Sequence, residues 1–294
     1  MREPLRVCIV VNPIAGSGQG RRRGEELEKG LAKEGCEVER LLTGAPGHAT
    51  QLAREAARRG ADVVVVCGGD GTVNEAVEGL AGTRTALAVM PIGLANVLGR
   101  EMKLSESPRR VTEVVVRGRR RRLDLGRCGK HVFLCMAGIG FDAFVTQRLA
   151  EVRKGPVSYL SYIRPIWRSL VEYGWEALEV RVDGRALDVP VYSVVVGNTR
   201  GYGGPFTLTP LARPDDGRLD VCAFAERGKA WLTFYMVATA GQVHHRFRSV
   251  RYARGTRIEV QASRPVPVEL DGDFKTYTPV SLELVPKGIT VLSG

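Results

Sequence analysis

The chain has 294 residues, of which 44% are hydrophobic and 26% charged, and its formal net charge is +11. A chain of this length and composition is a globular protein with room for two domains, each with its own core. No apolar run reaches the roughly 20 residues that span a bilayer, and the N-terminus lacks the layout of a signal peptide. We therefore expect a cytoplasmic protein.

The cysteines and the net charge limit the chemistry of the chain. The six cysteines lie singly in apolar surroundings, without a Cys-x-x-Cys pair, and only four histidines are present. Neither a zinc site nor a disulfide framework is expected, and we interpret the cysteines as reduced core residues. The positive charge fits a nucleic acid, an anionic membrane surface or phosphorylated ligands, and the arginine content equally fits genome composition or heat adaptation.

The first part of the chain alternates between strand and helix patterns. Runs of apolar, mostly β-branched residues predict strands over residues 5–11, 36–42, 63–66 and 86–90. Amphipathic stretches lie between these strands, and a helix is expected over residues 72–80, after the third strand. This alternation predicts an open parallel sheet covered by helices.

The most informative stretch is Gly-Gly-Asp-Gly-Thr at residues 68–72, directly after the third strand. We expect its glycines to allow a sharp turn and the close approach of a ligand. The helix that follows offers free N–H groups and a positive dipole end to an anion. Asp70 adds a carboxylate, which tolerates nearby phosphates when a divalent cation or a transferred proton lies between them. The loop therefore predicts a phosphate site with a metal ion.

This string resembles the nucleotide loop of diacylglycerol kinases, sphingosine and ceramide kinases and NAD kinases. The Asn-Pro opening at residues 12–18 and the Pro-Ile-Gly-Leu-Ala-Asn turn at residues 91–96 resemble further elements of the lipid kinase branch. The resemblance implies that Asp70 acts in catalysis by holding Mg²⁺ through water. It also implies an ATP site formed by Asn12, Thr43, Gly68, Gly69, Gly71, Thr72, Asn74, Gly93 and Asn96. Loops at the carboxyl ends of parallel strands share one edge of the sheet, so we expect these residues to converge.

Two positions depart from the family pattern. Leu94 stands where the family usually has Thr, and Val97 stands where many members carry Asp. A hydroxyl near the nucleotide and a carboxylate near the metal are therefore missing. These departures keep a catalytically silent regulatory protein, which binds nucleotide or lipid without turnover, as an alternative.

A dense basic run covers residues 117–122 and leads into Asp124. Such a run is typical of a solvated edge or hairpin, and contact with acidic lipid is the alternative. Asp124 matches an Asp on the strand by which family members cross into their second domain. The resemblance implies a catalytic role for it close to the phosphates.

The remainder of the chain consists mainly of short strand patterns separated by Gly, Pro and Asp turns, which predicts a β-sandwich. The expected strands cover residues 133–137, 179–182, 189–196, 219–224, 257–260 and 266–270. We predict an α/β ATP-binding catalytic domain over residues 1–123, completed by a returning strand at 281–294. Residues 124–280 would form a β-sandwich lipid-binding domain, with the active site in the interdomain cleft.

Two helical stretches, at residues 157–173 and 231–243, interrupt the predicted sandwich. The first interleaves tyrosine and tryptophan with Arg164 and Arg168, and the second begins at Trp231. Aromatic residues beside basic ones suit a membrane interface. Packing of the helices onto the sandwich explains the same aromatics.

Two acidic turns complete the resemblance. Asp-Asp-Gly-Arg-Leu-Asp at residues 215–220 resembles a family turn that holds a structural magnesium, although Asp-Asp-Gly is also simply a good hairpin. The resemblance assigns the metal to the side chain of Asp216 and to the carbonyls of Arg213 and Arg218. Asp273 stands where the family has the Glu of Asp-Gly-Glu, its general base. One methylene shorter, it can accept a hydroxyl proton from within about 3 Å.

Together these motifs identify the chain as a member of the diacylglycerol kinase catalytic family, bacterial type. The implied reaction is Mg²⁺-dependent transfer of the γ-phosphate of ATP to a lipid hydroxyl, taking diacylglycerol to phosphatidic acid. The implied partners are the lipid, an anionic inner-membrane surface bound peripherally, and a second copy in a homodimer. No nucleic-acid recognition motif is present. An NAD kinase remains an alternative, and the lipid itself stays open among diacylglycerol, phosphatidylglycerol, a sphingoid base and a polyprenol.

Overall fold

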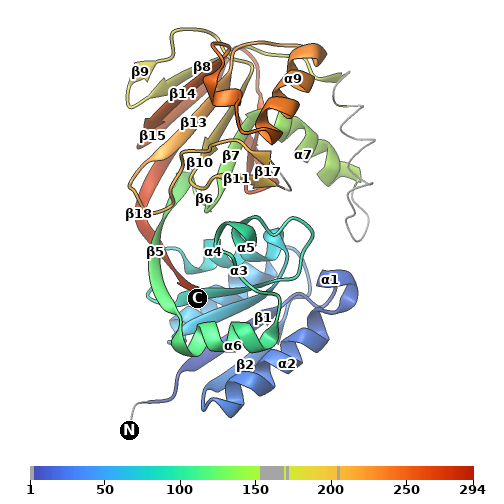
Figure 1. The fold of residues 1–294 in the computed structure, drawn as a ribbon, viewed down its shortest axis with the longest axis vertical. Helices are drawn as coiled ribbons and strands as arrows, with labels where there is room; N and C mark the ends of the chain where they lie inside the picture. Colours follow the sequence, from blue (N-terminus) through green and yellow to red (C-terminus); the bar gives the residue numbers. More distant parts are fainter. Residues whose placement is uncertain (1–2, 153–168, 170–171, 204–205) are drawn as a thin grey trace. The chain divides into compact units, whose positions relative to one another are not determined.

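The computed structural model describes residues 3–294 except 153–168, 170–171 and 204–205 (Figure 1). The chain divides into two compact units, Met1–Leu123 with Pro286–Gly294, and Asp124–Val285. The first unit is α/β with parallel strands and the second is a β-sandwich, so the predicted fold class is confirmed.

The first unit is built on a parallel sheet in the strand order β2-β1-β3-β4-β18. Every residue of β3 is buried, as expected for an apolar strand that is covered on both faces. The strands are β1 (Arg6–Val11), β2 (Glu37–Leu42), β3 (Val63–Gly68), β4 (Ala86–Pro91) and the end of β18 (Val280–Ser293).

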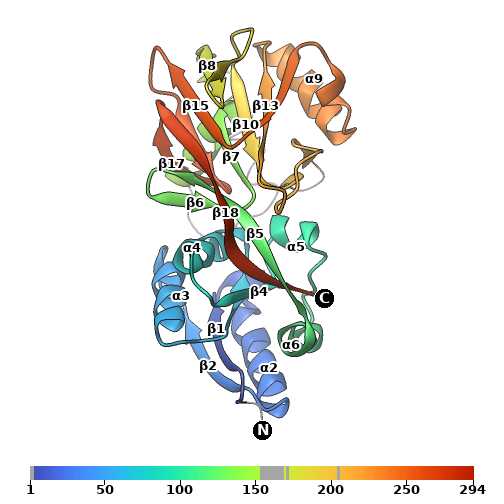
Figure 2. The same ribbon diagram turned by 90° about the vertical axis from the view of Figure 1, so that its left-hand side faces the viewer.

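Helices cover both faces of this sheet, with α2 and α6 on one side and α3 and α4 on the other (Figure 2). Leu27 and Leu31 of α2 and Val111 of α6 pack with strand side chains in one core. The α3 and α4 helices approach closely at Gly79, where a Cβ would stand 2.5 Å from the carbonyl oxygen of Thr50. The helices are α1 (Ala15–Gly18), α2 (Gly20–Lys33), α3 (His48–Arg58), α4 (Asp70–Leu80), α5 (Val97–Glu101) and α6 (Pro108–Arg117).

The returning strand enters the first unit later than expected. Residues Val280 to Glu283 of β18 pair antiparallel with β15 (Arg257–Ala262), which places them in the second unit. Only around Thr290 does β18 pair in parallel with β4. Because one long strand serves both sheets, the part that completes the first unit begins at Pro286 instead of residue 281.

The basic run forms the start of a strand, β5 (Arg119–Cys128), whose first four residues are exposed arginines. β5 pairs with β18, and the Arg122 guanidinium donates a 3.1 Å hydrogen bond to the carbonyl oxygen of Lys287. A solvated strand, and not a hairpin, therefore carries these charges.

The second unit packs two sheets face to face. One has the order β14-β13-β10-β7-β16-β17. The other contains β18, β15, β8 and β9, with β5 beside β18 and β6 beside β5. Ile139 and Val221 of the first sheet pack against Leu178 and Ile258 of the second. The remaining strands are β6 (His131–Phe133), β7 (Met136–Gly140), β8 (Leu178–Val182), β9 (Arg185–Ala186), β10 (Ser193–Gly197), β11 (Gly201–Gly203), β12 (Phe206–Thr207), β13 (Leu219–Phe224), β14 (Val250–Gly255), β16 (Pro267–Leu270) and β17 (Asp273–Tyr277).

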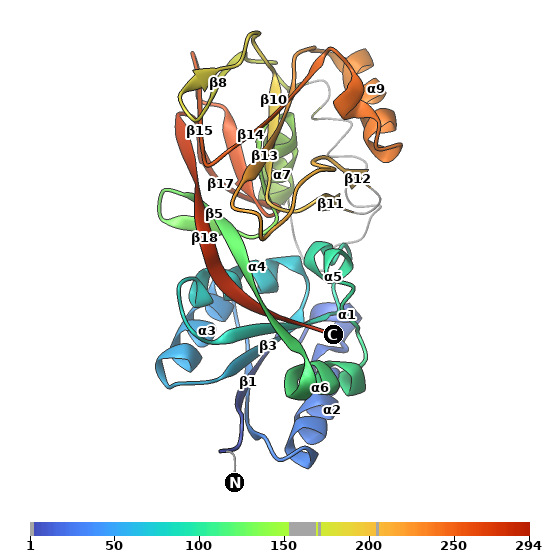
Figure 3. The ribbon, with the colours of Figure 1, turned by 60° about the vertical axis from the view of Figure 1, so that its left-hand side comes forward.

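Two helices, α7 (Phe141–Val152) and α9 (Lys229–Ala240), lie on the outer face of the β14-to-β17 sheet (Figure 3). Tyr235 of α9 packs on Cys222 and Phe224 of that sheet. A short 3-10 helix, η1 (His244–Arg246), follows α9. None of the helices in the described part of the chain is long and apolar enough to cross a membrane.

Several sequence expectations need correction here. The strand predicted over residues 133–137 is split into β6 and β7, because Leu134 and Cys135 point their N–H groups at Asp271 instead of at a strand. The strand predicted over residues 189–196 begins only at Ser193. The helix expected at 231–243 is α9, whereas that at 157–173 falls mostly outside the described residues, and α7 was not predicted.

Candidate functional site

The loops that follow β1, β3 and β4 are tied together at the carboxyl ends of these strands. The backbone N–H of Asn12 donates to the carbonyl oxygen of Cys67 at 2.9 Å. The Asn12 amide also donates to Thr72 Oγ1 at 3.1 Å. The N–H of Ile92 donates to the carbonyl oxygen of Gly68 at 3.0 Å. The first unit therefore brings three of the predicted nucleotide loops into direct contact.

The Gly-Gly-Asp-Gly-Thr stretch is less of a turn than the sequence suggested. Helix α4 begins at Asp70, two residues before the expected start, with Gly69 as its N-cap. Asp70 and Gly71 therefore lie in the first helical turn, whose N–H groups have no acceptor within the helix. None of the three glycines adopts a left-handed backbone. These glycines instead allow close packing of neighbouring loops and leave space for a ligand.

Each glycine of the loop has a different neighbour. A Cβ on Gly68 would stand 2.7 Å from the Cβ of Thr72, and one on Gly69 would stand 3.1 Å from the Cα of Gly93. These two glycines let the β3 and β4 loops touch. A Cβ on Gly71 would meet nothing within 4 Å, and Gly71 is exposed. The start of α4 is therefore open beside Gly71, where an anion can approach the free N–H groups.

Asp70 bridges the β3 and β4 loops. Its Oδ2 accepts a 2.8 Å hydrogen bond from the N–H of Asn96, and its Oδ1 accepts a 2.6 Å bond from the N–H of Val97. The Asn96 side chain in turn accepts from the N–H of Gly93 at 2.8 Å. Asp70 thus caps the start of α5, a structural task that the sequence did not reveal. The cap fixes the carboxylate, and each oxygen keeps a further lone pair for water.

The remaining predicted nucleotide residues lie near the same edge. Thr43 follows β2, and its N–H donates to the carbonyl oxygen of Val11 at 2.9 Å. Asn74 lies on α4 and is partly exposed. Its neighbour Glu75 accepts from the N–H groups of Gly47 and Ala49, at 2.8 and 3.0 Å, and so caps α3. The sequence shows Glu75 close to the Gly-Gly-Asp-Gly-Thr stretch. It does not reveal this cap, because Ala49 lies 26 residues away along the chain.

In the second unit, Asp124 supports the predicted metal turn. Its buried carboxylate accepts from the N–H of Gly217 at 2.8 Å, and its own N–H donates to the carbonyl oxygen of Pro214 at 2.6 Å. Asn198 donates to the Asp124 carbonyl oxygen at 2.8 Å. Asp124 therefore holds the turn that carries Arg213, Asp216 and Arg218. Its expected role near the phosphates stays a prediction.

The metal site expected at Asp216 has suitable donors but also a competing cation. Asp216 Oδ1 accepts from the N–H of Arg218 at 3.1 Å, and Oδ2 pairs with the guanidinium of Arg254. Arg254 also lies 3.4 Å from Oδ2 of Asp220, a buried carboxyl whose pKa is raised by desolvation. One carboxylate with backbone carbonyls is a donor set that Mg²⁺ accepts. The residues therefore fit Mg²⁺, provided that Arg254 gives way.

No cluster of three or more His, Cys, Asp or Glu side chains in the described part of the chain could hold a metal ion. The sites expected at Asp70 and Asp216 each depend on a single carboxylate, with water or carbonyl oxygens as the other ligands. They would therefore not form such a cluster.

The turn before Asp273 is anchored by Asp271. Its carboxylate accepts three hydrogen bonds from the N–H groups of Leu134, Cys135 and Met136, at 2.7, 2.8 and 2.8 Å. Desolvation raises the pKa of Asp271 to about 6, although these three donors lower it. Asp271 and Gly272 are both left-handed, with φ of 51° and 87°. The Asp-Gly pair was the available sequence signal for this turn.

Asp273 is the first residue of β17, directly after this anchored turn. Its side chain is 39% exposed, and one carboxylate oxygen lies 3.5 Å from Nζ of Lys275. An exposed carboxylate on a fixed backbone, paired with a flexible cation, is free to accept a proton from a substrate. The structure therefore allows the predicted base, and adds Asp271 as the residue that fixes its backbone.

Comparison with known proteins follows the same division of the chain. A family model described as the diacylglycerol kinase catalytic domain matches residues 6–128. A second, described as the YegS C-terminal NAD kinase beta sandwich-like domain, matches residues 135–293. A diacylglycerol kinase of Mycobacterium tuberculosis (strain CDC 1551 / Oshkosh) is 30% identical over 302 residues, covering 98% of this chain and 94% of that protein.

Two further proteins agree. A diacylglycerol kinase of Bacillus subtilis (strain 168) is 27% identical over 278 residues, covering 93% of this chain and 91% of that protein. A crystal structure of a diacylglycerol kinase from Bacillus anthracis str. Sterne has the same fold, with a TM-score of 0.77 at 22% identity, covering 100% of this chain and 98% of that chain. The resemblance found in the motifs is confirmed: the chain belongs to the diacylglycerol kinase family.

Proposed function

We propose that this protein is an ATP-dependent lipid kinase that transfers the γ-phosphate of ATP to the free hydroxyl of diacylglycerol, forming phosphatidic acid. The observation that carries the proposal is the bridge from Asp70 to the Asn96–Val97 backbone at the open start of α4. It lies in a chain whose family members are named diacylglycerol kinases. No observation favours a silent regulatory protein or an NAD kinase.

The start of α4 would bind the phosphates of ATP. The N–H groups of Gly71 and Thr72 belong to the first turn of an 11-residue helix, where the helix dipole favours negative charge. Gly71 leaves the surface beside them open. Asn12, Thr43 and Asn74 stand at the same edge of the sheet and would line the nucleotide. Gly68, Gly69, Gly93 and Asn96 would act by shaping the two loops.

Mg²⁺ would neutralise charge on the transferring phosphoryl group. We propose that Asp70 holds it through water, since both carboxylate oxygens already accept a backbone N–H. A second, structural Mg²⁺ would bind Asp216 with the carbonyls of Arg213 and Arg218. Asp124, through Gly217, would keep that turn in shape.

Asp273 would act as the general base. Its carboxylate takes the proton of the lipid hydroxyl as the hydroxyl oxygen forms a bond to the γ-phosphorus, and the bond from that phosphorus to the bridging oxygen of ADP breaks. The reaction therefore yields phosphorylated lipid, ADP and protonated Asp273. Before the lipid binds, the ammonium of Lys275 lies 3.5 Å from one oxygen of this carboxylate.

We further propose that the protein works peripherally on the inner membrane surface, with α9 as its docking element. Trp231, Phe234 and Val237 are spaced to share one face of this helix, and their exposed fractions are 38%, 39% and 71%. Tyr235, Ala238 and Thr239 of the same helix are buried. Large apolar side chains that stay in water on a well-packed helix indicate an interaction surface.

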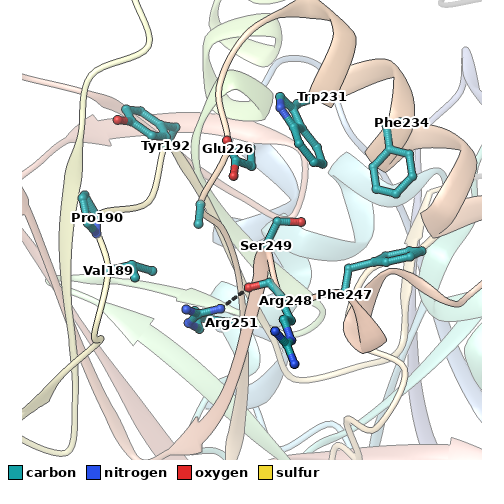
Figure 4. Close-up of a pocket in the computed structure, with 11 residues that line it drawn as sticks. Val189, Pro190, Tyr192, Glu226, Trp231, Phe234, Phe247, Arg248, Ser249 and Arg251 are labelled. Carbon is teal, nitrogen blue, oxygen red and sulfur yellow. Dashed lines mark hydrogen bonds between the residues drawn. The ribbon is translucent and has the colours of Figure 1, made fainter.

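A pocket of about 560 Å³ lies beside this helix, between it and the sandwich (Figure 4). Trp231, Phe234 and Phe247 form one side of the pocket, and the rings of Phe234 and Phe247 are 4.9 Å apart. Tyr192, Pro190 and Val189 lie across from these rings (Figure 4). Arg248 and Arg251 also line the pocket, and Arg251 pairs with Asp188 at 2.8 Å. Aromatic rings beside arginines match an interface of acyl chains and anionic headgroups.

A radiolabelled phosphate transfer assay with ATP, Mg²⁺ and mixed micelles tests the kinase proposal. Diacylglycerol, phosphatidylglycerol, a sphingoid base, a polyprenol and NAD would be offered in parallel. We expect labelled phosphatidic acid from the native protein and at least a 100-fold loss of this product in Asp273→Asn. Tight ATP binding without transfer to any acceptor would instead support the silent regulatory protein, and labelled, phosphorylated NAD would support an NAD kinase.

Vesicle co-sedimentation tests the docking proposal. We expect binding to vesicles of phosphatidylglycerol and phosphatidylcholine, and at least tenfold weaker binding to phosphatidylcholine alone. The double substitution Trp231→Ser, Phe234→Ser should reduce binding to the anionic vesicles by a similar factor. Leu211→Ser is the matched control, since Leu211 is 54% exposed in the same unit but outside α9. Equal binding by both variants would rule out α9 as the docking element.

A further inference from the structure

Two acids outside every motif, the buried Glu269 and the half-buried Asp142, face each other in the second unit. Glu269 lies on β16, opposite Gly138 of β7, and Asp142 lies in the first turn of α7, four residues after Gly138. Gly140, with φ of 111°, lets the chain leave β7 and enter α7 at once, which brings Asp142 back over the strand. A Cβ on Gly138 would stand 2.6 Å from Glu269 Oε1 and nearer still to Asp142 Oδ2. A glycine at position 138 is therefore what makes room for both carboxyl groups.

The facing oxygens have no other hydrogen-bond partner. Asp142 Oδ2 and Glu269 Oε1 are both buried without a donor among the described residues. Both oxygens approach the same point beside Gly138, so the two carboxyl groups face each other. Carboxylate oxygens only accept, so a hydrogen bond between two carboxyl groups requires a proton on one of them. Two ionised carboxylates in contact inside the protein would repel strongly.

The surroundings favour keeping that proton. Desolvation raises the pKa of Asp142, and desolvation together with the charge of Asp142 raises the pKa of Glu269. The other charged group that faces the pair is Asp271, which also raises the pKa of Glu269, with Asp273 beyond it. Near the start of α7, the hydroxyl of Tyr173 lies close to Gly140, two residues before Asp142. The cation on β17, Lys275, is paired with Asp273 at 3.5 Å, and Asp271 adds negative charge beside the pair.

The pair also touches the turn that presents Asp273. Glu269 Oε2 accepts a 2.5 Å hydrogen bond from the N–H of Gly272. Asp271 holds the same turn from its other side, through the N–H groups of residues 134–136. The backbone just before Asp273 is therefore fixed at two consecutive residues. Glu269 therefore contacts the turn through Oε2 and faces Asp142 through Oε1.

We propose that Asp142 and Glu269 share one proton at neutral pH, and that this pair is a positioning device that holds the Asp271–Gly272 turn and thereby the backbone of Asp273. The pair does not touch the substrate in this proposal. Its link to activity rests on the proposed role of Asp273 as base, whereas the shared proton and the turn contact do not.

Replacing either carboxyl group by an amide removes the shared proton but keeps a hydrogen bond between the two side chains. In Asp142→Asn or Glu269→Gln an N–H replaces the shared proton, so the contact survives without titrating. Glu269→Leu removes both the contact and the acceptor for Gly272. Infrared difference spectra with labelled aspartate or glutamate would detect a protonated carboxyl at pH 7. Amide exchange of the segment containing Gly272 would report on the turn.

We expect a protonated carboxyl signal in the native protein at pH 7 that is absent in both amide variants. Since protonation stabilises the folded pair, the melting temperature of Asp142→Asn relative to the native protein should rise by about 2–4 °C between pH 5 and pH 8. Glu269→Leu should exchange at Gly272 at least tenfold faster, with a lower kcat and an unchanged KM for ATP. The amide variants should keep native exchange and kcat.

The result that overturns the proposal is a native protein without a protonated carboxyl at pH 7, or an Asp142→Asn variant with native pH dependence. The amide variants keep the test decisive if Glu269→Leu fails to fold. A native protein that transfers no phosphate would defeat the proposed function, while the spectra, the melting curves and the exchange data would still decide on the pair.

Discussion

The carboxylate of Asp70 accepts a 2.6 Å hydrogen bond from the backbone N–H of Val97, 27 residues further along the chain. Val97 stands at the position where the family resemblance leads us to expect a second acid. Here its backbone N–H binds the first acid, Asp70. The same carboxylate accepts from the N–H of Asn96 at 2.8 Å, so Asp70 ties the β3 loop to the start of α5. Asp70 therefore has a structural role that is separate from any contact with a metal.

A comparison of Asp70 with Glu75, which also caps a neighbouring helix, should separate the structural role of Asp70 from its proposed role in catalysis. We expect Asp70→Ala and Glu75→Ala each to lower the free energy of unfolding by about 1–2 kcal/mol, because each removes the acid that caps a neighbouring helix. Only Asp70→Ala should abolish phosphate transfer. Denaturant unfolding and the transfer assay measure the two effects. Equal loss of transfer in both variants would show that Asp70 acts through stability alone.

Two glycines of the loop, Gly69 and Gly71, should respond differently to replacement by alanine. Gly71→Ala should fold normally, and its stability should rise by up to about 1 kcal/mol, because the added Cβ meets nothing and glycine weakens a helix. The same Cβ should obstruct the phosphates and weaken ATP binding at least tenfold. Gly69→Ala should instead lose stability, since its Cβ would press on the Cα of Gly93. Titration calorimetry with ATP and thermal unfolding test both, and native ATP affinity in Gly71→Ala would place the nucleotide elsewhere.

We expect the activity to depend on the presence of a carboxylate at position 273 more than on the length of the side chain that carries it. We expect Asp273→Glu to stay within about tenfold of the native kcat, because it keeps a base on the same anchored turn. Asp273→Asn, of the same shape as the native residue, should lose about 100-fold to 10,000-fold. Initial rates at saturating ATP make the comparison. A fully active Asp273→Asn would mean that another group accepts the proton.

Asp271 should make stability depend on pH in the direction opposite to an ordinary surface acid. Its pKa is about 6 in the folded protein against 3.8 normally. The folded state therefore binds its proton more tightly, so its contribution is full below pH 4 and is lost as the pH rises through 6. The difference amounts to about 3 kcal/mol. Asp271→Asn should be less stable throughout, since one amide oxygen cannot serve three N–H donors, and should lack this slope.

Asp183 is a matched control for that experiment. It also accepts from backbone N–H groups, those of Thr256 and Arg257, but these bonds lower its pKa. Its stabilising contribution is therefore present above pH 4 and is lost as the pH falls through its lowered pKa. Unfolding by denaturant from pH 3 to 8 should show opposite changes of slope for Asp183→Asn and Asp271→Asn. Slopes of the same sign would contradict the assignment of Asp271.

Magnesium should stabilise the second unit through Asp216 in the absence of nucleotide. At a concentration 100 times the dissociation constant, Mg²⁺ would add about 2.7 kcal/mol to the free energy of unfolding. Asp216→Asn should abolish this gain. Arg254→Met should strengthen Mg²⁺ binding, since it removes the guanidinium that pairs with the carboxylate. Thermal unfolding with Mg²⁺ and with EDTA provides the measurement, and an unchanged gain in Asp216→Asn would place the ion at another site.

Much of the architecture could be predicted because its signals are local. The buried valine run of β3 and the alternation of strands and helices indicated the parallel sheet, and short runs between turns indicated the sandwich. The predicted bounds were wrong where a residue far away in the sequence determines the local structure. Leu134 and Cys135 leave their strand because Asp271, more than 130 residues away, accepts their N–H groups. Residue 281 stays in the second unit because β15 pairs with it.

The sequence by itself determined which chemical groups the protein has and where they stand along the strands. The loop at residues 68–72, the acid at Asp273 and the family to which the chain belongs all follow from short contiguous strings. Only the tertiary structure decided what those groups touch: Asp70 with Val97, and Asp142 with Glu269 across Gly138. The physical reason is that a helix or strand follows from neighbours in the chain, whereas the partner of a buried carboxyl is set by pairings between distant strands.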